Sequence, residues 1–148
     1  FRKILDSLRQ SYDYIFIDCP PSLGILSLNA LAASNGVIIP MQCEFYSLEG
    51  MSQLLNTVKK IRKLYNPSLQ IVGILLTMYN ARLTLTYQVV EELKKYYADI
   101  LFKVPISRTV RLSEAPGYGK PICYHDPYCK GALEYAQVAK ELGRRPCL

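Results

Sequence analysis

The order of apolar segments in this sequence predicts an α/β domain with a mostly parallel sheet and flanking helices. Short apolar runs that are typical of buried strands alternate with longer segments whose apolar positions recur at helical spacing. Such alternation indicates βαβ units, in which helices connect parallel strands. A chain of 148 residues, half of them hydrophobic and a fifth charged, fits one domain or part of one.

The first half of the chain is predicted to begin with a helix, a strand, a helix and a second strand. Their ranges are 1–10, 13–18, 22–34 (closed by Gly36) and 37–40. The first of these strands is apolar throughout and ends on Asp18, after which two prolines stop it. Ser47 is the expected N-cap of the next helix, whose apolar stripe contains Leu48, Met51, Leu55 and Val58.

The second half continues the same alternation. It contains a predicted strand over 69–78, a helix over 84–97, a strand over 100–104 and a last helix over 131–142. The helix over 84–97 is expected to bury Leu85, Val89, Leu93 and one of its two tyrosines. Prolines and glycines make 105–130 an irregular stretch between the last two of these elements.

Composition narrows the classes of function. A net charge of +6 permits an anionic partner such as nucleic acid. No apolar stretch approaches the ~20 residues of a membrane span. The chain begins within a helical pattern, without Met or a signal peptide, so we expect an upstream part to be missing. Five scattered cysteines suit a reducing cytoplasm, and Cys123, His125 and Cys129 lack a second ligand pair for a structural metal site.

Asp18 is the first candidate functional residue. An acid at the carboxyl end of a parallel strand lies on the edge where open α/β sheets bind ligands. In nucleotide-hydrolysing proteins an acid at this place holds Mg²⁺, usually through water. A cap on the helix after the prolines explains the same residue equally well. The Gly-rich GK[ST] loop that would hold phosphates is not present in the sequence.

Five short motifs occur in one order along residues 1–143. They are DYIFIDCPPS at 13–22, LNAL at 28–31, YSLEG at 46–50, GILLTMY at 73–79 and RLSEAP at 111–116. In this order and spacing they resemble the ParA/Soj family of chromosome- and plasmid-partitioning ATPases, a branch that includes the cell-division protein MinD. The resemblance implies a P-loop NTPase fold, Rossmann-like and three-layered, of which residues 1–148 are a single partial domain, the carboxyl-terminal portion.

The resemblance also implies a function. Such proteins bind ATP with Mg²⁺, form homodimers around two nucleotides and bind DNA non-specifically. A ParB-like centromere-binding protein stimulates hydrolysis. The phosphate loop and the catalytic aspartate are then expected upstream of Phe1, so this chain should hold no catalytic residue and be inactive alone. The implied location is the cytoplasm, in association with the nucleoid.

The family match assigns nucleotide contacts to particular residues. Asp18 matches the acid that organises the Mg²⁺ shell. Ser107 and Thr109 lie in the segment that matches the loop along the adenine base, where the family usually has proline and asparagine. Met78 would lie under the same ring, although core packing is nearly as good an explanation. Glu44 would face the partner subunit and its nucleotide, with a surface acid of no function as the competing interpretation.

Arg82 and Arg111 match basic positions that the family uses to contact the DNA backbone. Lys120 and Lys130 are candidates to broaden this patch. Guanidinium groups pair with phosphate oxygens without reading sequence. A lone surface arginine more often serves solubility, but the motifs beside both arginines fix the match.

Two other functions compete with this one. A MinD-like positioning ATPase would end in a basic amphipathic helix that binds membrane, whereas residues 142–148, LGRRPCL, are too short and interrupted for one. DNA is therefore the expected partner and a membrane is not. A non-enzymatic, flavodoxin-like binding module would explain the sheet pattern but not the motifs at 18–21 and 111–116.

Overall fold

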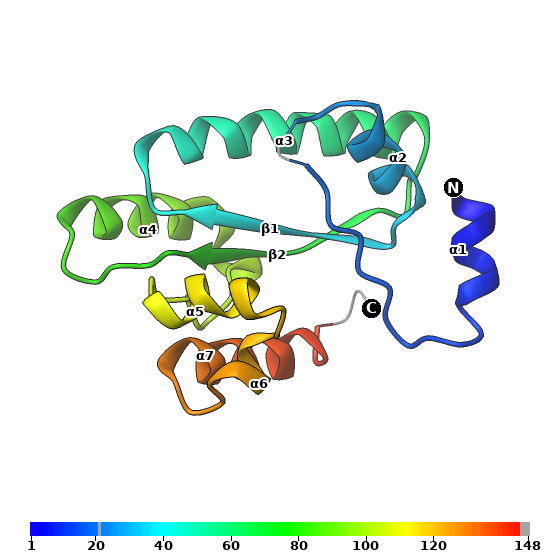
Figure 1. Ribbon diagram of the computed structural model, residues 1–148. Helices are drawn as coiled ribbons and strands as arrows, with labels where there is room; N and C mark the ends of the chain where they lie inside the picture. The colour runs from blue at the N-terminus through cyan, green and yellow to red at the C-terminus, as the bar shows by residue number, and fades with distance from the viewer. Residues whose placement is uncertain (21, 146–148) are drawn as a thin grey trace.

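A parallel β-strand pair lies at the centre of the computed structural model, which describes residues 1–20 and 22–145 (Figure 1). In this part of the chain the sheet consists of β1 (Gly36–Gln42) and β2 (Gln70–Thr77). Their register runs from Gly36 opposite Gln70 to Gln42 opposite Thr77. The long helix α3 (Phe45–Leu64) connects the two strands, which makes the βαβ unit that the sequence predicts.

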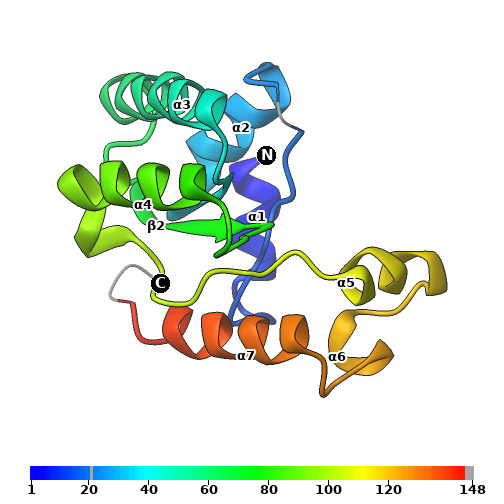
Figure 2. The same ribbon diagram turned by 90° about the vertical axis from the view of Figure 1, so that its left-hand side faces the viewer.

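Helices cover both faces of this strand pair (Figures 1 and 2). The remaining elements are α1 (Arg2–Leu8), α2 (Ile25–Ala33), α4 (Thr84–Tyr97), η1 (Ala98–Ile100), α5 (Val110–Glu114), η2 (Ala115–Tyr118), α6 (Ile122–His125) and α7 (Lys130–Leu142). Along β2, Ile74 and Leu76 pack with α3 and α4, whereas Val72 and Leu75 pack with α7. A register shift between Val37 and Ile38 leaves Val72 as an extra residue in β2, so Val72 enters the same core as Leu75 and not that of Ile74. Side chains of β2 thus enter a core on each face of the sheet, which confirms the α/β class.

The predicted elements of the second half are largely present. Helix α4 has the predicted range 84–97, β2 is one residue shorter than predicted at each end, and α7 starts one residue earlier than predicted. In α4 the buried residues are Thr86, Val89 and Leu93, which share one helical face. Leu85 lies at the margin of that face and is 38% exposed, so its predicted burial was wrong.

The predicted strand over 13–18 is not formed. This segment has no regular secondary structure, and Tyr14 and Phe16 are 50% and 70% exposed. An apolar run becomes a buried parallel strand only where neighbouring strands satisfy its backbone groups. Within the described residues no strand pairs with 13–18, so its pattern is not realised.

The boundaries of α2 and α3 also differ from the sequence prediction, and α1 is shorter than the predicted 1–10 at both ends. Helix α3 starts at Phe45 with Glu44 as its N-cap, so Ser47 lies inside the first turn. Helix α2 begins at Ile25 and ends at Ala33, so Gly36 does not close it. Gly36 begins β1 instead, where a Cβ atom would lie 2.3 Å from Cγ2 of Val72. Close packing of the two strands, not helix termination, accounts for this glycine.

The predicted strand over 100–104 is reduced to a few ladder bonds. Ile100 ends η1, and Leu101 forms a single bridge with Ile74. The following residues stay beside β2, since Phe102 N donates to Ile74 O at 2.9 Å and Ile106 N to Leu76 O at 2.8 Å. Pro105 has no N–H to donate and interrupts the ladder. The predicted irregular stretch then contains three short helical elements, α5, η2 and α6.

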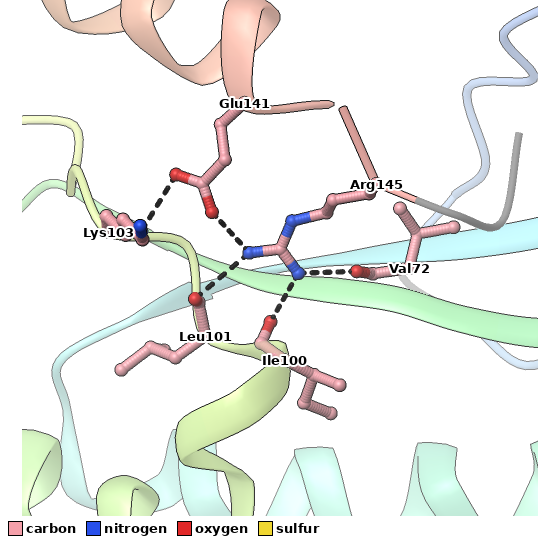
Figure 3. Close-up of polar contacts among 6 residues, drawn as sticks. All are labelled: Val72, Ile100, Leu101, Lys103, Glu141 and Arg145. Carbon is pink, nitrogen blue, oxygen red and sulfur yellow. Dashed lines mark hydrogen bonds and ion pairs between the residues drawn. The ribbon is translucent and has the colours of Figure 1, made fainter. Parts of the chain in front are cut away.

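A largely buried arginine side chain holds the end of α7 against the sheet (Figure 3). Arg145 donates from Nη1 to Val72 O at 2.6 Å and to Ile100 O at 3.1 Å, and from Nη2 to Leu101 O at 3.0 Å. Its ion-pair partner is Glu141, one turn earlier in α7. Glu141 also accepts from Lys103 N at 3.0 Å. These contacts hold 100–103 against the amino-terminal half of β2.

Candidate functional site

The carboxyl ends of β1 and β2 form one edge, because parallel strands end on the same side. Gln42 lies opposite Thr77 at this edge, and Thr77 Oγ1 donates to Met41 O at 3.4 Å. Glu44 follows the end of β1, and Met78 follows the end of β2. The topology therefore brings two of the predicted nucleotide residues to the edge where α/β sheets bind ligands.

Met78 has a strained backbone conformation. Its φ of 49° makes it the one non-glycine residue with positive φ in the described chain. Such a conformation costs free energy for a side chain with a Cβ atom. The side chain is 54% exposed, so core packing, the competing explanation for Met78, is wrong. The flexible, apolar side chain of Met78 therefore lies at the surface at this edge of the sheet, on a strained backbone.

Residues 105–109, which we call the base loop, lie beside Met78. Tyr79 and Ser107 form an isolated parallel bridge. Tyr79 N donates to Ile106 O at 2.9 Å, and Arg108 N donates to Tyr79 O at 3.3 Å. The loop is therefore an extension of the sheet at its carboxyl edge, next to the predicted nucleotide residues.

The side chains of Ser107 and Thr109, the two predicted nucleotide residues of the base loop, both form hydrogen bonds within the protein. Ser107, 9% exposed, donates through its backbone N–H to Glu134 Oε2 and through its hydroxyl to Glu134 Oε1, each at 2.7 Å. Thr109 is the N-cap of α5, and its Oγ1 accepts from Leu112 N at 3.3 Å. A ligand would have to contact other backbone groups of the loop, since the N–H groups of Ile106, Ser107 and Arg108 are also bonded within the protein. Sequence analysis missed Glu134, because no local pattern reveals that α7 packs against this loop.

Glu44 is exposed at the amino end of α3. It is the N-cap residue, without a side-chain hydrogen bond to the helix. A carboxylate there is favoured by the positive end of the helix dipole.

Asp18 is exposed in the non-regular segment before α2. The N-cap of α2 is Gly24, so the competing explanation of Asp18 as the cap of this helix is wrong. Its carboxylate has no hydrogen bond or ion pair to any of the residues described. A free carboxylate fits one contact to Mg²⁺, which keeps several waters and needs few protein ligands. The described residues contain no group of three or more His, Cys, Asp or Glu side chains that would hold a metal alone.

The predicted DNA-binding cations are exposed but differ in their partners. Arg111 forms ion pairs with Glu114 at 3.1 Å and with Asp126 at 3.4 Å. Arg82, in the turn after β2, has its backbone N–H bonded to Asn80 Oδ1 at 3.0 Å. Lys120 follows η2 in the segment between α5 and α6. Arg111 is therefore partly neutralised before any phosphate binds.

The comparisons with known proteins give the family. A family model described as "AAA domain" matches residues 1–71. The chain is 56% identical over 141 residues to the sporulation initiation inhibitor protein Soj of Bacillus subtilis (strain 168), which covers 95% of this chain and 56% of that protein. This chain belongs to the ParA/Soj family. The chromosome partitioning protein ParA of Myxococcus xanthus (strain DK1622) is 50% identical over 144 residues, 97% of this chain and 51% of the relative.

The ParA/Soj chain spans about half the length of the curated relatives that it matches. Among solved structures, cobyrinic acid a,c-diamide synthase of Mycobacterium smegmatis with bound ADP and magnesium is similar, with a TM-score of 0.77. It is 33% identical, and the match covers 97% of this chain and 51% of that one. The fold is that of P-loop NTPases. In the described part of the chain, no helix combines the length and apolar character needed to cross a membrane.

Proposed function

We propose that this protein is a ParA-like partitioning ATPase that segregates a chromosome or plasmid. In the proposal it binds ATP with Mg²⁺, forms a dimer and binds DNA without sequence preference. The observation that carries the proposal is 56% identity to a Soj protein over 95% of the chain. The structure supports the proposal at the carboxyl edge of the sheet. There the strained and exposed Met78 lies beside the base loop.

In this proposal the base loop and Met78 contact adenine, and Glu44 faces the second subunit of the homodimer. Bound Mg²⁺ neutralises charge on the phosphates and orients them for transfer to water. Asp18 contributes a carboxylate that orders the waters around the ion. The phosphate loop and the catalytic aspartate lie outside residues 1–148, so these residues alone bind ATP weakly and do not hydrolyse it.

The DNA contacts of the proposal come from Arg82, Arg111 and Lys120. Lys130, ion-paired with Glu134 at 3.6 Å, is a further candidate. Lysine and arginine that neutralise phosphates displace counterions, which gives affinity without base readout. Arg111 must exchange its bonds to Glu114 and Asp126 for phosphate, whereas no side-chain ion pair holds Arg82 in the described residues. We therefore expect Arg82 to contribute more to DNA affinity than Arg111. A ParB-like protein is the proposed activator, and the nucleoid in the cytoplasm is the proposed location.

The test is ATP-dependent DNA binding by the full-length protein at several salt concentrations. Arg82→Glu with Arg111→Glu should weaken binding to random-sequence and specific DNA alike. Each lost phosphate contact should reduce the log–log salt slope by about 0.9. Lys59→Glu with Lys63→Glu is the matched control, because it makes the same charge change on the exposed face of α3.

Dimerisation with ATP should persist in both double variants, since none of the four side chains is assigned to nucleotide. DNA affinity and salt slope equal to those of the parent protein in the arginine variant would contradict this DNA surface. A parent protein that binds DNA equally well without ATP would contradict the proposed nucleotide control.

A further inference from the structure

Glu134 is a largely buried carboxylate for which the proposed nucleotide and DNA chemistry has no role. Its side chain is 12% exposed in the second turn of α7. Its two oxygens accept the backbone N–H and the hydroxyl of Ser107, both at 2.7 Å. Lys130, one turn earlier, adds a cation 3.6 Å from Oε1. A desolvated carboxylate that takes two donors from one residue makes strong, directional bonds.

These bonds clamp the base loop to α7, in addition to the bonds that hold the loop to the sheet. Ser107 is bridged to Tyr79 at the end of β2, while Glu134 holds it from α7. Tyr79 directly follows the strained Met78. Glu134 therefore acts on the position of the base loop, and through Tyr79 on the end of β2, without lying in the loop itself.

We propose that Glu134 is a positioning residue for nucleotide-base binding. It sets the backbone of the base loop so that the loop can lie along the adenine ring. This inference rests on the proposed function, which assigns 105–109 to the base. It predicts that loss of the Glu134–Ser107 bonds lowers the affinity for ATP, because contacts to the base are weakened. The interaction with the phosphates should stay unchanged.

Glu141 provides a matched control on the same helix. It lies seven residues after Glu134 and also accepts a backbone N–H from the segment beside β2, that of Lys103 at 3.0 Å. It is similarly buried, at 19% exposed. Lys103 precedes the base loop and does not contact Met78 or Tyr79 through any bond of the described chain. A purely structural role of such carboxylates would appear equally at both positions.

The experiment measures binding of ATP and of inorganic triphosphate to the full-length protein, with KM and kcat for ATP hydrolysis. Glu134→Gln keeps the size of the side chain and removes its charge, so that the amide oxygen accepts the Ser107 N–H and the NH₂ group donates to the serine hydroxyl through neutral bonds. We expect about five- to tenfold weaker ATP binding and a matching rise in KM, because a charge-assisted bond at the loop is lost. In this variant the affinity for triphosphate and kcat should stay within about twofold of the values of the parent protein. In Glu141→Gln the affinities for both ATP and triphosphate should stay within the same range.

Ser107→Ala tests whether Glu134 acts through this serine. The double variant Ser107→Ala with Glu134→Gln should lose less ATP affinity than the product of the single losses, because the two groups form one unit. If circular dichroism shows that Glu134→Gln does not fold, Ser107→Ala alone decides. Ser107→Ala should then lower the affinity for ATP by about two- to fivefold and leave the affinity for triphosphate unchanged.

Three results would overturn the inference. They are parent-like ATP binding in Glu134→Gln, an equal loss for ATP and triphosphate, or an equal effect of Glu141→Gln. In the fallback case, parent-like ATP binding in Ser107→Ala overturns it. A parent protein that does not bind ATP contradicts the proposed function instead, so the two failures are distinguishable.

Discussion

The guanidinium of Arg145 lies 4.0 Å from the centroid of the Phe102 ring, at the end of the sheet opposite the candidate site. The same group donates to carbonyls of Val72 in β2, of Ile100 at the end of η1 and of Leu101 after it (Figure 3). Phe102 itself belongs to the core between β2 and α7. One side chain thus links two backbone segments and a core aromatic, where strand pairing is limited to a single bridge at Leu101.

Arg145→Met should destabilise the protein by about 2–4 kcal/mol. The change leaves three carbonyls without their donor and Glu141 without its cation, and removal of one partner of a buried pair is costly. The measurement is the free energy of unfolding by urea for the full-length protein. Arg144→Met is the control, because Arg144 is an exposed neighbour and should shift this free energy by less than about 0.5 kcal/mol. Equal effects at both positions would contradict the role of the guanidinium.

Gly73→Ala and Gly50→Ala should change stability in opposite directions. A Cβ at Gly73 would lie 2.6 Å from Cε2 of Phe102, 2.7 Å from Nη1 of Arg145 and 2.8 Å from Ile100 O. We expect a loss of roughly 1–3 kcal/mol from this overpacking. At Gly50, inside α3, the added Cβ would meet no atom within 4 Å beyond its chain neighbours and the nearby backbone of its own helix, so alanine should stabilise by up to about 1 kcal/mol. Thermal unfolding of both variants checks the two signs.

Cys43 should resist alkylation while the exposed Cys19 and Cys123 react. Burial raises the pKa of the Cys43 thiol, which keeps it protonated in the folded protein. Mass spectrometry after iodoacetamide treatment at neutral pH measures the order of reaction. Modification of Cys43 as fast as of Cys19, without unfolding, would contradict this prediction.

The same thiol makes stability depend on alkaline pH. Because its pKa is higher in the folded state, the unfolded chain loses this proton first as the pH rises. The free energy of unfolding should therefore fall from the ordinary cysteine pKa of about 8.5 upward, until the folded thiol also ionises. Cys43→Ala should remove this part of the pH dependence, which urea titrations at several pH values measure.

Asp18→Ala in the full-length protein should reduce Mg²⁺-dependent ATP hydrolysis by at least about tenfold, because the ion loses a group that orders its waters. ATP binding should survive in part, since other groups hold the nucleotide. Asp13→Ala is the control, an exposed acid in the same segment. Hydrolysis that is unchanged across a magnesium titration would exclude the metal role of Asp18.

Local sequence patterns were sufficient to predict the elements whose own residues show the periodicity of a helix or the apolar run of a strand. Helix α4 has a face of apolar residues at helical spacing, and the apolar run of β2 is bounded by turn residues, so both were predicted almost to the residue. The position of Glu44 and Met78 at one edge agrees with parallel strand order, since each follows the end of a strand, whereas the assignment of the base loop to this site came from the family resemblance. These features depend on periodicity and strand direction, which neighbouring residues determine.

Tertiary structure decided the features that depend on partners distant in sequence. The apolar segment 13–18 has the composition of a strand but no strand beside it in the described chain, so its backbone stays unpaired. The bonds from Glu134 to Ser107 and from Arg145 to Val72 join residues that lie 27 and 73 positions apart. No local pattern encodes such pairs, because a buried charge is stable only where folding brings its donors or acceptors to it.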